Sequence, residues 1–296
     1  MLMQNRQQHQ PEIQAYLQKE FACQQWEFTL PHGYGKESYF AHGNGQTYFV
    51  KLGAPIAVYL AMASMDLTPS MMATGLLEDG TSLLVQPYID GRKPSRKDFH
   101  AHLSTIATMI RRMHHSQEVG GVLPDARSDL YSVLGLDALT HVQQRWEQHK
   151  AQVPALAAWV DEKLACLEQQ AQSLPGSGLV ASHHDICNAN WLIASDEKIY
   201  LIDFDSVSLD DPASDIGALL WWYYPPELRA RFLEITGYAN HEQFRNRMKV
   251  RMAIHCLHII LPREQSFDEF DPENFAESLT DFRAVMEGKE NPQGYN

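Results

Sequence analysis

The first third of the chain alternates between short apolar runs and turn residues. Ile13, Leu17 and Phe21 recur at four-residue spacing, which predicts a helix over residues 11–23. Residues 26–85 read as strands and turns, with one helix, "APIAVYLAMASM", among them. "SYFAHGNGQTYFVKLG" predicts a β-hairpin, because two aromatic, β-rich runs flank glycines and an asparagine that tolerate positive φ. "TSLLVQPYIDG" predicts a strand that runs into a connector.

After Gly91 the apolar positions follow helical spacing. "SRKDFHAHLSTIATMIRRMHHS" predicts a helix, which Ser95 is placed to cap. Further helices are expected over residues 126–150, 154–173, 213–223, 226–236 and 241–261, and "SLPGSG" interrupts this series. The expected fold class is α+β and bilobal, with a small β-rich N-lobe over residues 1–88 and a larger, mainly helical C-lobe over 89–296.

The stretch "HHDICNANWLIASDEKIYLIDFD" combines two short apolar runs with several oxygen-bearing side chains. "WLIA" and "IYLI", separated by "SDEK", predict a second hairpin. With its turn centred on residues 196 and 197, Asn190 and Asp203 are equidistant from the turn and face each other about 5 Å apart at Cα. Two such oxygen ligands suit Mg²⁺, which also takes substrate phosphates. Asp185 lies five residues before Asn190 and is placed to act as a base, the arrangement that phosphoryl transfer requires.

Composition narrows the classes of partner. The chain has 296 residues with 44% apolar and 21% charged positions, which suits a globular protein with a sizeable core. Its net charge of −13 argues against a nucleic-acid partner, which calls for a basic face. The same acidity is compatible with a cationic small molecule, although an acidic surface is more often an ordinary solubility device.

Cysteines and apolar runs indicate the compartment. The four cysteines form no CxxC pair, so neither a disulfide framework nor a zinc site is expected. The glutamine-rich start has no apolar core of a secretory signal, and no apolar run approaches the roughly 20 residues that span a bilayer. We therefore expect a cytoplasmic protein with no membrane partner.

The motifs around the second hairpin resemble those of the protein-kinase-like superfamily. "HHDICNAN" is similar to the H-x-D-x-x-x-x-N catalytic loop and "IDFD" to the metal-binding D-F-G element. The variant looks closest to the aminoglycoside phosphotransferase and choline kinase branch, whose pattern resembles H-G-D-x-x-x-x-N, I-D-[FW]-[ED] and D-P-x-x-D. "DPASDIG" matches the last element. The resemblance implies a protein-kinase-like fold.

The resemblance also implies roles for individual residues. Asp185 corresponds to the catalytic base, and Asn190 and Asp203 to the Mg²⁺ ligands. His183 corresponds to the histidine that braces the loop, and Asp215 to a buried aspartate that supports it. A purely structural role is the favoured interpretation for Asp215. The nearby aspartate at position 205 is either a second metal contact or a cap.

The upstream half contains the elements that would hold a nucleotide. The resemblance predicts that a loop with Gly33 and Gly35 covers the phosphates and that Lys51 pairs with them. Taken alone, a lysine on an edge strand is more often a solubility device. Backbone groups of Gln86 and Tyr88, in the lobe connector, are expected to meet an adenine or guanine.

One family feature is missing. The helix after the lysine usually carries a glutamate that pairs with it, but "APIAVYLAMASM" has no acidic residue and the next one is Asp66. Three alternatives remain open: another group such as Glu37 takes over, phosphates alone hold Lys51, or the protein is a weakened or non-catalytic nucleotide binder.

The acceptor pocket is expected in the helical lobe beside Asp185. An acidic run is either an attractor of a polycation or, more often, a solvated face; its members are Glu264, Asp268, Glu269, Asp271 and Glu273. The cluster "WWYY" at 221–224 is either a cation–π cage or, more often, core. Two histidine pairs have metal-like spacing but no third ligand and are read as ordinary polar positions: His100 with His102, and His255 with His258.

The sequence therefore predicts a small-molecule kinase. It would use Mg²⁺ to transfer the γ-phosphate of ATP or GTP to a hydroxyl of an aminoglycoside-like, amino-sugar or amino-alcohol (choline- or ethanolamine-like) acceptor, a small and cationic partner. The alternative from another class is a nucleotide-binding pseudokinase that acts as an interaction module. A protein kinase is disfavoured because no A-P-E element or activation segment follows Asp203.

Overall fold

The computed structural model describes residues 9–31, 37–123, 136–174, 178–238, 240–262 and 269–295. The chain divides into two compact units by its contacts. The first unit takes Met1–Lys93 and Asn190–Asp205, and the second takes Pro94–Ala189 and Ser206–Asn296. The lobes expected over 1–88 and 89–296 stay a prediction, and each unit is described separately below.

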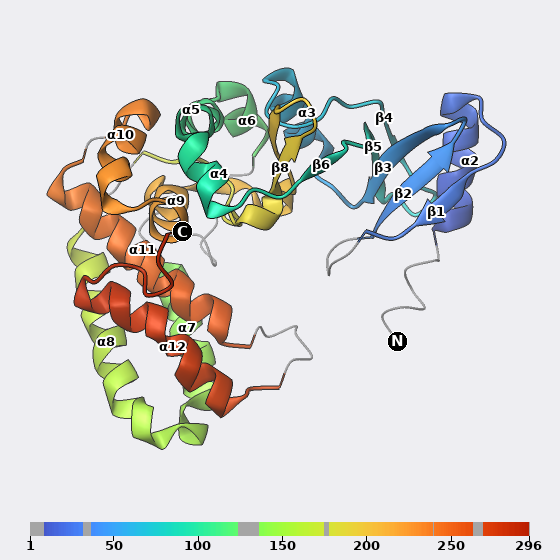
Figure 1. Ribbon diagram of the computed structural model, residues 1–296. Helices are drawn as coiled ribbons and strands as arrows, with labels where there is room; N and C mark the ends of the chain where they lie inside the picture. The colour runs from blue at the N-terminus through green and yellow to red at the C-terminus, as the bar shows by residue number, and fades with distance from the viewer. Residues whose placement is uncertain are drawn as a thin grey trace. The chain divides into compact units, whose positions relative to one another are not determined.

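An antiparallel sheet forms the centre of the first unit, with strand order β1-β2-β3-β5-β4 in the described residues. Its strands are β1 (Glu27–Thr29), β2 (Ser38–Gly43), β3 (Gln46–Leu52), β4 (Ala73–Leu76) and β5 (Ser82–Pro87). Helix α2 (Gln10–Phe21) lies against this sheet (Figure 1), where Ile13 and Leu17 join Val50 and Leu83 in one apolar core. The four-residue apolar spacing of the sequence is therefore the buried face of α2.

The predicted first hairpin is confirmed as β2 and β3, paired from Ser38↔Lys51 to Gly43↔Gln46. Asn44 (φ 52°) and Gly45 (φ 71°) make its two-residue turn, and both adopt the left-handed backbone that these residue types tolerate. Helix α3 (Ile56–Ser64) follows β3 as the sequence predicts.

The second hairpin is confirmed, but its predicted register is wrong by one residue. Strands β8 (Trp191–Ala194) and β9 (Ile199–Leu201) pair with Trp191 opposite Leu201, and β6 (Gly91–Arg92) pairs with β8. The turn closes from Ala194 to Lys198 around three residues, one of which, Glu197, has φ 65°. Asn190 therefore lies opposite Ile202, whose N–H donates to the Asn190 carbonyl at 2.9 Å, and Asp203 lies one residue beyond. The prediction assumed a turn with an even number of residues, whereas the observed turn has three, including the left-handed Glu197.

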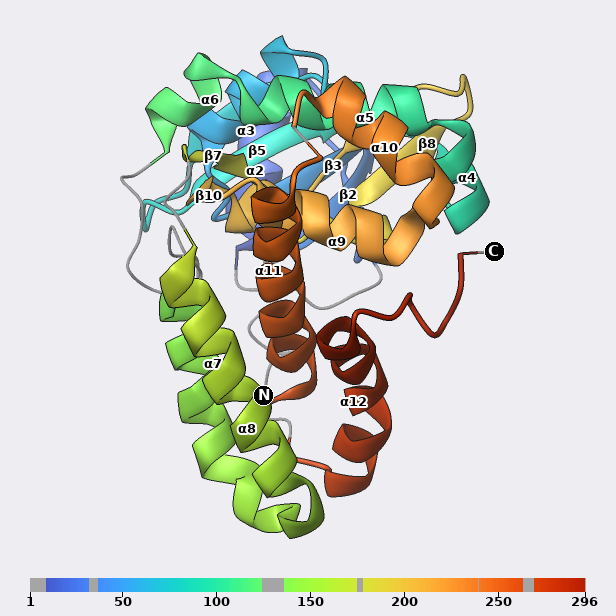
Figure 2. The ribbon, with the colours of Figure 1, turned by 90° about the vertical axis from the view of Figure 1, so that its left-hand side faces the viewer.

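Helices make up most of the second unit. They are α4 (Arg96–Ala101), α5 (Leu103–His114), α6 (Gln117–Val122), α7 (Leu136–His149), α8 (Pro154–Ser173), α9 (Ala213–Tyr223), α10 (Pro226–Thr236), α11 (Glu242–Ile260) and α12 (Pro272–Glu287). Figure 2 shows α11 lying alongside α7 and α12. Side chains of α7, α8, α11 and α12 share one apolar core, in which Trp146 stacks on Phe275. None of the described helices is long and apolar enough to span a bilayer.

Local signals in the sequence set several of these helix ends. Ser95 caps α4 as predicted: its hydroxyl accepts from the Asp98 N–H, and the Asp98 carboxylate accepts from the Ser95 N–H. The single helix predicted after Ser95 is divided in two at His102. The helix predicted from residue 126 begins at 136 in the described part of the chain. Strands β7 (Val180–Ser182) and β10 (Ser208–Asp210) pair near α5.

Candidate functional site

Lys51 occupies a central position in the sheet of the first unit. Strand β3 is third in the strand order, so the edge-strand interpretation of this lysine does not apply. The side chain is only 7% exposed, and its ammonium lies 2.6 Å from Asp203 Oδ1 and 2.9 Å from Asp205 Oδ2. A buried ammonium is costly unless it is paired, and here two carboxylates supply the pairing.

A tyrosine on α3 completes the surroundings of this ammonium. Lys51 Nζ donates to the Tyr59 hydroxyl at 3.3 Å. Burial alone would lower the pKa of Lys51, but Tyr59, Asp205 and Asp203 outweigh it and raise the pKa above its ordinary value. Burial also raises the pKa of Tyr59, to about 12. Lys51 is therefore a cation and Tyr59 a neutral phenol throughout the physiological range.

The backbone after β9 turns sharply and presents Asp203. This residue adopts φ 67°, a left-handed conformation that aspartate tolerates better than most residues. A short 3₁₀ turn, η3 (Phe204–Ser206), follows. Phe204 is fully buried and packs edge-on against Tyr59, with ring centroids 5.1 Å apart, which anchors the segment to α3. The Asp203 side chain stays 46% exposed, so a ligand can reach it.

Asn190 and Asp203 supply suitable donor chemistry for Mg²⁺. A carboxylate and an amide oxygen are hard ligands, and Mg²⁺ usually takes only one or two from the protein and completes its shell with water and phosphate. Within the described ranges, no group of three or more His, Cys, Asp and Glu side chains is arranged to hold a metal ion. Asn190 and Asp203 as Mg²⁺ ligands stay a prediction.

The second unit holds the loop that contains Asp185. Both oxygens of the buried Asp215 carboxylate accept backbone N–H groups of this loop, from His183 at 2.7 Å and from His184 at 3.0 Å. His114 Nε2 donates to the same carboxylate at 3.1 Å. Burial alone would raise the pKa of Asp215, but the hydrogen bond from His114 and the neighbouring imidazoles hold it well below its usual range. An ionised aspartate thus anchors the loop to α9.

The histidines of this loop have separate structural roles. The Asp185 N–H donates to His183 Nδ1 at 3.3 Å, the bracing role that the resemblance implies for His183. His184 has φ 65°, which explains why glycine suits this position in the H-G-D pattern. Its imidazole instead contacts Ser208 Oγ at 2.8 Å, and burial lowers its pKa to about 3, so it is neutral at physiological pH.

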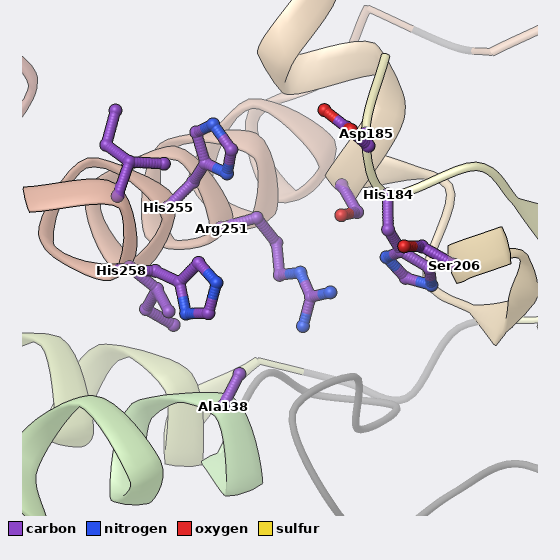
Figure 3. Close-up of a pocket in the computed structure, with 10 residues that line it drawn as sticks. Ala138, His184, Asp185, Ser206, Arg251, His255 and His258 are labelled. Atoms are coloured by element: carbon purple, nitrogen blue, oxygen red, sulfur yellow. The ribbon is translucent and has the colours of Figure 1, made fainter. Parts of the chain in front are cut away.

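A cavity of about 220 Å³ opens beside Asp185 within the second unit. In Figure 3 the side chains of Arg251, His255 and His258 enter it from α11, with Asp185 and His184 on the other side. Arg251 also pairs with the buried Asp210 carboxylate. The lining therefore offers hydrogen-bond donors and acceptors around an exposed carboxylate.

Further predicted residues are placed as follows. Gly33 and Gly35 lie outside the described residues. Gln86 is buried, and its side-chain amide donates to the Pro69 carbonyl at 2.7 Å. Tyr88 is exposed, and its N–H donates to the Thr47 carbonyl at 3.1 Å. Backbone contacts of Gln86 and Tyr88 to a nucleotide base stay a prediction.

Two alternatives from the sequence are decided by side-chain placement. Glu37 contacts His9 and Tyr39, and no described contact joins it to Lys51.

The aromatic cluster at 221–224 packs as core: its two tryptophans lie against the buried cluster, and Tyr223 stacks on Phe99 at 4.0 Å. The Tyr223 hydroxyl also accepts the Asn188 N–H at 2.7 Å, which supports the loop after Asp185. Of the acidic run, Glu264 and Asp268 lie outside the described residues.

Sequence reasoning missed several residues of these two sites. Tyr59 carries no family signature, and Asp205 was left between two roles. His255 and His258 were taken as ordinary polar positions, yet both line the cavity beside Asp185. The only available signal was weak, namely that their spacing places them on one face of a helix.

Comparisons with known proteins agree with these observations. Residues 29–252 match the phosphotransferase enzyme family. Among solved structures, the chain is similar to a choline/ethanolamine kinase family protein from Mesorhizobium loti, with 17% identity, TM-score 0.66 and 96% of each chain covered. It is also similar to spectinomycin phosphotransferase (15%, 0.63, with 94% of this chain and 96% of the other covered). A choline kinase from Streptococcus pneumoniae matches at 15% and 0.60, over 94% of this chain and 99% of the other.

The structural neighbours confirm the predicted fold class, α+β of the protein-kinase-like phosphotransferase type, with a sheet in the N-terminal region and helices in the C-terminal region. The family match extends from β1 to α11, and so includes Lys51, Asp185, Asn190 and Asp203. A match over this much of the chain, with the motif residues inside it, identifies the family: the chain belongs to the phosphotransferase enzyme family.

Proposed function

We propose that this phosphotransferase moves the γ-phosphate of ATP or GTP to a hydroxyl group of a small molecule. The observation that carries the proposal is the buried Lys51 ammonium, held within 3 Å of Asp203 and Asp205 in the first unit. A buried cation beside the carboxylate of the metal-binding motif is the arrangement that triphosphate binding needs. Neighbours of known structure are complexes with ADP and GDP, which supports a nucleoside triphosphate as the donor.

Each proposed residue has one role. Lys51 pairs with phosphate oxygens, and Asn190 and Asp203 hold Mg²⁺, which supplies neutralisation of the phosphate charge when bound. Asp185 accepts the proton of the acceptor hydroxyl as its oxygen attacks the γ-phosphorus. The bond from the γ-phosphorus to the bridging oxygen breaks, and the nucleoside diphosphate leaves. Asp185 suits this role because its side chain is exposed beside the cavity while its backbone is fixed by His183.

The size of the cavity bears on the acceptor. Sites for drug-sized ligands usually measure about 300–1,000 Å³. The cavity beside Asp185, at about 220 Å³, is better matched to a small amino alcohol or a single amino sugar than to a multi-ring aminoglycoside. The net charge of −13 favours a cationic acceptor of this kind. The structural neighbours include a choline kinase and a spectinomycin phosphotransferase, so they do not by themselves select between a small and a larger acceptor.

The test is acceptor-stimulated nucleotide turnover. ATP and GTP consumption is measured with Mg²⁺ against choline, ethanolamine, single amino sugars, ketosamines and aminoglycosides. We expect Asp185→Asn to abolish turnover and leave nucleotide binding nearly intact, and Asp203→Ala to abolish turnover. Asp196→Asn, an exposed turn aspartate, is the matched control and should behave as wild type. Wild-type turnover in the Asp185→Asn protein would contradict the assigned base.

A second function has one observation in its favour. Among the described residues of α3 no acidic side chain pairs with Lys51, and this feature favours a nucleotide-binding module without turnover. The same assays separate the two functions. Nucleotide binding with no turnover above background for any acceptor in the panel would favour the binding module.

A further inference from the structure

We propose that the phenol of Tyr59 positions Lys51, the role that a glutamate on this helix usually has in the family. We further propose that Asp205 forms the ion pair that Lys51 keeps when a ligand engages Asp203. The expected effect on kcat rests on the proposed function, whereas the expected effect on the Lys51 amine does not. Its structural content concerns four residues of the first unit: Lys51, Tyr59, Asp203 and Asp205.

The Tyr59 hydroxyl joins three segments that are separate in the sequence. It accepts from Lys51 Nζ on β3 at 3.3 Å and from the Phe204 N–H, in the segment after β9, at 3.4 Å. A phenol oxygen has two lone pairs, so both acceptances are possible at once. The tyrosine is 2% exposed and its ring packs edge-on against Phe204, which fixes the hydroxyl position. A movement of α3 would therefore displace both the lysine and the metal-binding segment.

The charge balance explains why a phenol suits this place. Asp203 and Asp205 already put two carboxylates beside one ammonium. A glutamate on α3 would add a third negative charge in a buried region that has to accept phosphate. Tyr59 offers a hydrogen-bond acceptor with no charge, because a phenol is neutral at physiological pH.

The two aspartates are not equivalent partners. The Asp203 side chain is 46% exposed and is the proposed metal ligand, whereas the Asp205 side chain is 20% exposed. If Asp203 were to hold a metal ion, the ion pair with Asp205 and the hydrogen bond to Tyr59 would still position the lysine, because neither contact involves Asp203. The position after the metal-binding aspartate and phenylalanine thus takes over the charge that α3 lacks.

The first experiment removes the hydroxyl alone. With wild-type protein and the most active acceptor, we expect Tyr59→Phe to lower kcat by about tenfold, because a buried donor on Lys51 loses its acceptor. Tyr16→Phe is the control, since it loses a hydroxyl bond in the same unit, to the Thr74 carbonyl at 2.8 Å, without touching Lys51. The control should keep wild-type kcat, and urea titration should show that both variants are folded under the assay conditions. Wild-type kcat in Tyr59→Phe overturns the inference, as does a loss of kcat matched by the control.

The second experiment does not depend on turnover. Labelling of the Lys51 amine by an acylating reagent is followed by peptide mass spectrometry. We expect labelling to rise severalfold in Tyr59→Phe and in Asp205→Asn, and to stay at the wild-type rate in Tyr16→Phe. Unchanged labelling in both Tyr59→Phe and Asp205→Asn overturns the inference. If labelling of the variants follows this pattern but the wild-type protein has no turnover, the proposed function is contradicted and the positioning role of Tyr59 stands.

Discussion

Replacing Asp215 by asparagine tests whether one buried carboxylate holds the loop that contains Asp185. Asp215 is 1% exposed and accepts three hydrogen bonds, from the His183 N–H, the His184 N–H and His114 Nε2. Asparagine has the same shape but only one acceptor oxygen. With that oxygen in the place of Oδ2, the bonds from His183 and His114 survive, and the new amide donor faces the His184 N–H.

The expected cost follows from that geometry. Two donors then oppose each other in a buried site, and each orphaned donor costs about 1–3 kcal/mol. Asp215→Asn should therefore lower the free energy of unfolding by about 2–6 kcal/mol. For a chain of this size, each kcal/mol corresponds to a shift of about 2–4 °C in Tm. A fall in Tm of at least about 4 °C is the expected result.

Urea unfolding followed by tryptophan fluorescence measures the change, with Glu234→Gln as control. Glu234 is exposed on α10, so its substitution makes the same change of charge without removing a buried contact. Turnover should also fall in Asp215→Asn, because the loop backbone that carries Asp185 loses an anchor. An unfolding free energy within about 0.5 kcal/mol of the Glu234→Gln protein would refute the reasoning, since surface changes alone reach that size.

Two further predictions concern packing and pH. Gly91→Ala should destabilise the protein by about 1–3 kcal/mol, because an added Cβ would lie 2.5 Å from the Ile193 carbonyl oxygen; Gly178→Ala, which meets nothing within 4 Å, is the control in the same urea titration. Because the folded-state pKa of Asp215 is lowered, its contribution to stability is complete above the ordinary aspartate pKa of about 3.9 and is lost as pH falls through the folded value. Acid titration of unfolding should therefore show a steeper loss for wild type than for Asp215→Asn, and equal slopes would contradict the assignment.

Much of the fold was predictable because its signals are local. The turn of the first hairpin follows from Asn44 and Gly45, which accept positive φ, and the start of α4 follows from Ser95 and Asp98 within one turn. The limits of α9 and α10 agree with the predicted ranges 213–223 and 226–236, where prolines begin the helical segments.

The failures have a common physical cause. The second hairpin was predicted with an even turn, and a single left-handed residue, Glu197, shifted its register. Turn length depends on backbone conformations that the side chains around it do not specify uniquely. The helix predicted after Ser95 is divided at His102, although its sequence has helical spacing throughout.

The sequence by itself determined the family motifs, the boundaries of several helices such as α8, α9 and α10, and the identities of Lys51, Asp185, Asn190 and Asp203 as candidates. Such inferences depend on spacing along the chain, because residues within one helical turn or one hairpin are close in space regardless of the tertiary packing. Only the tertiary structure decided what holds the lysine. Tyr59 and Asp205 meet Lys51 because a helix and a segment distant in the sequence both reach the ammonium, and the nearby carboxylates offset the cost of burying its charge.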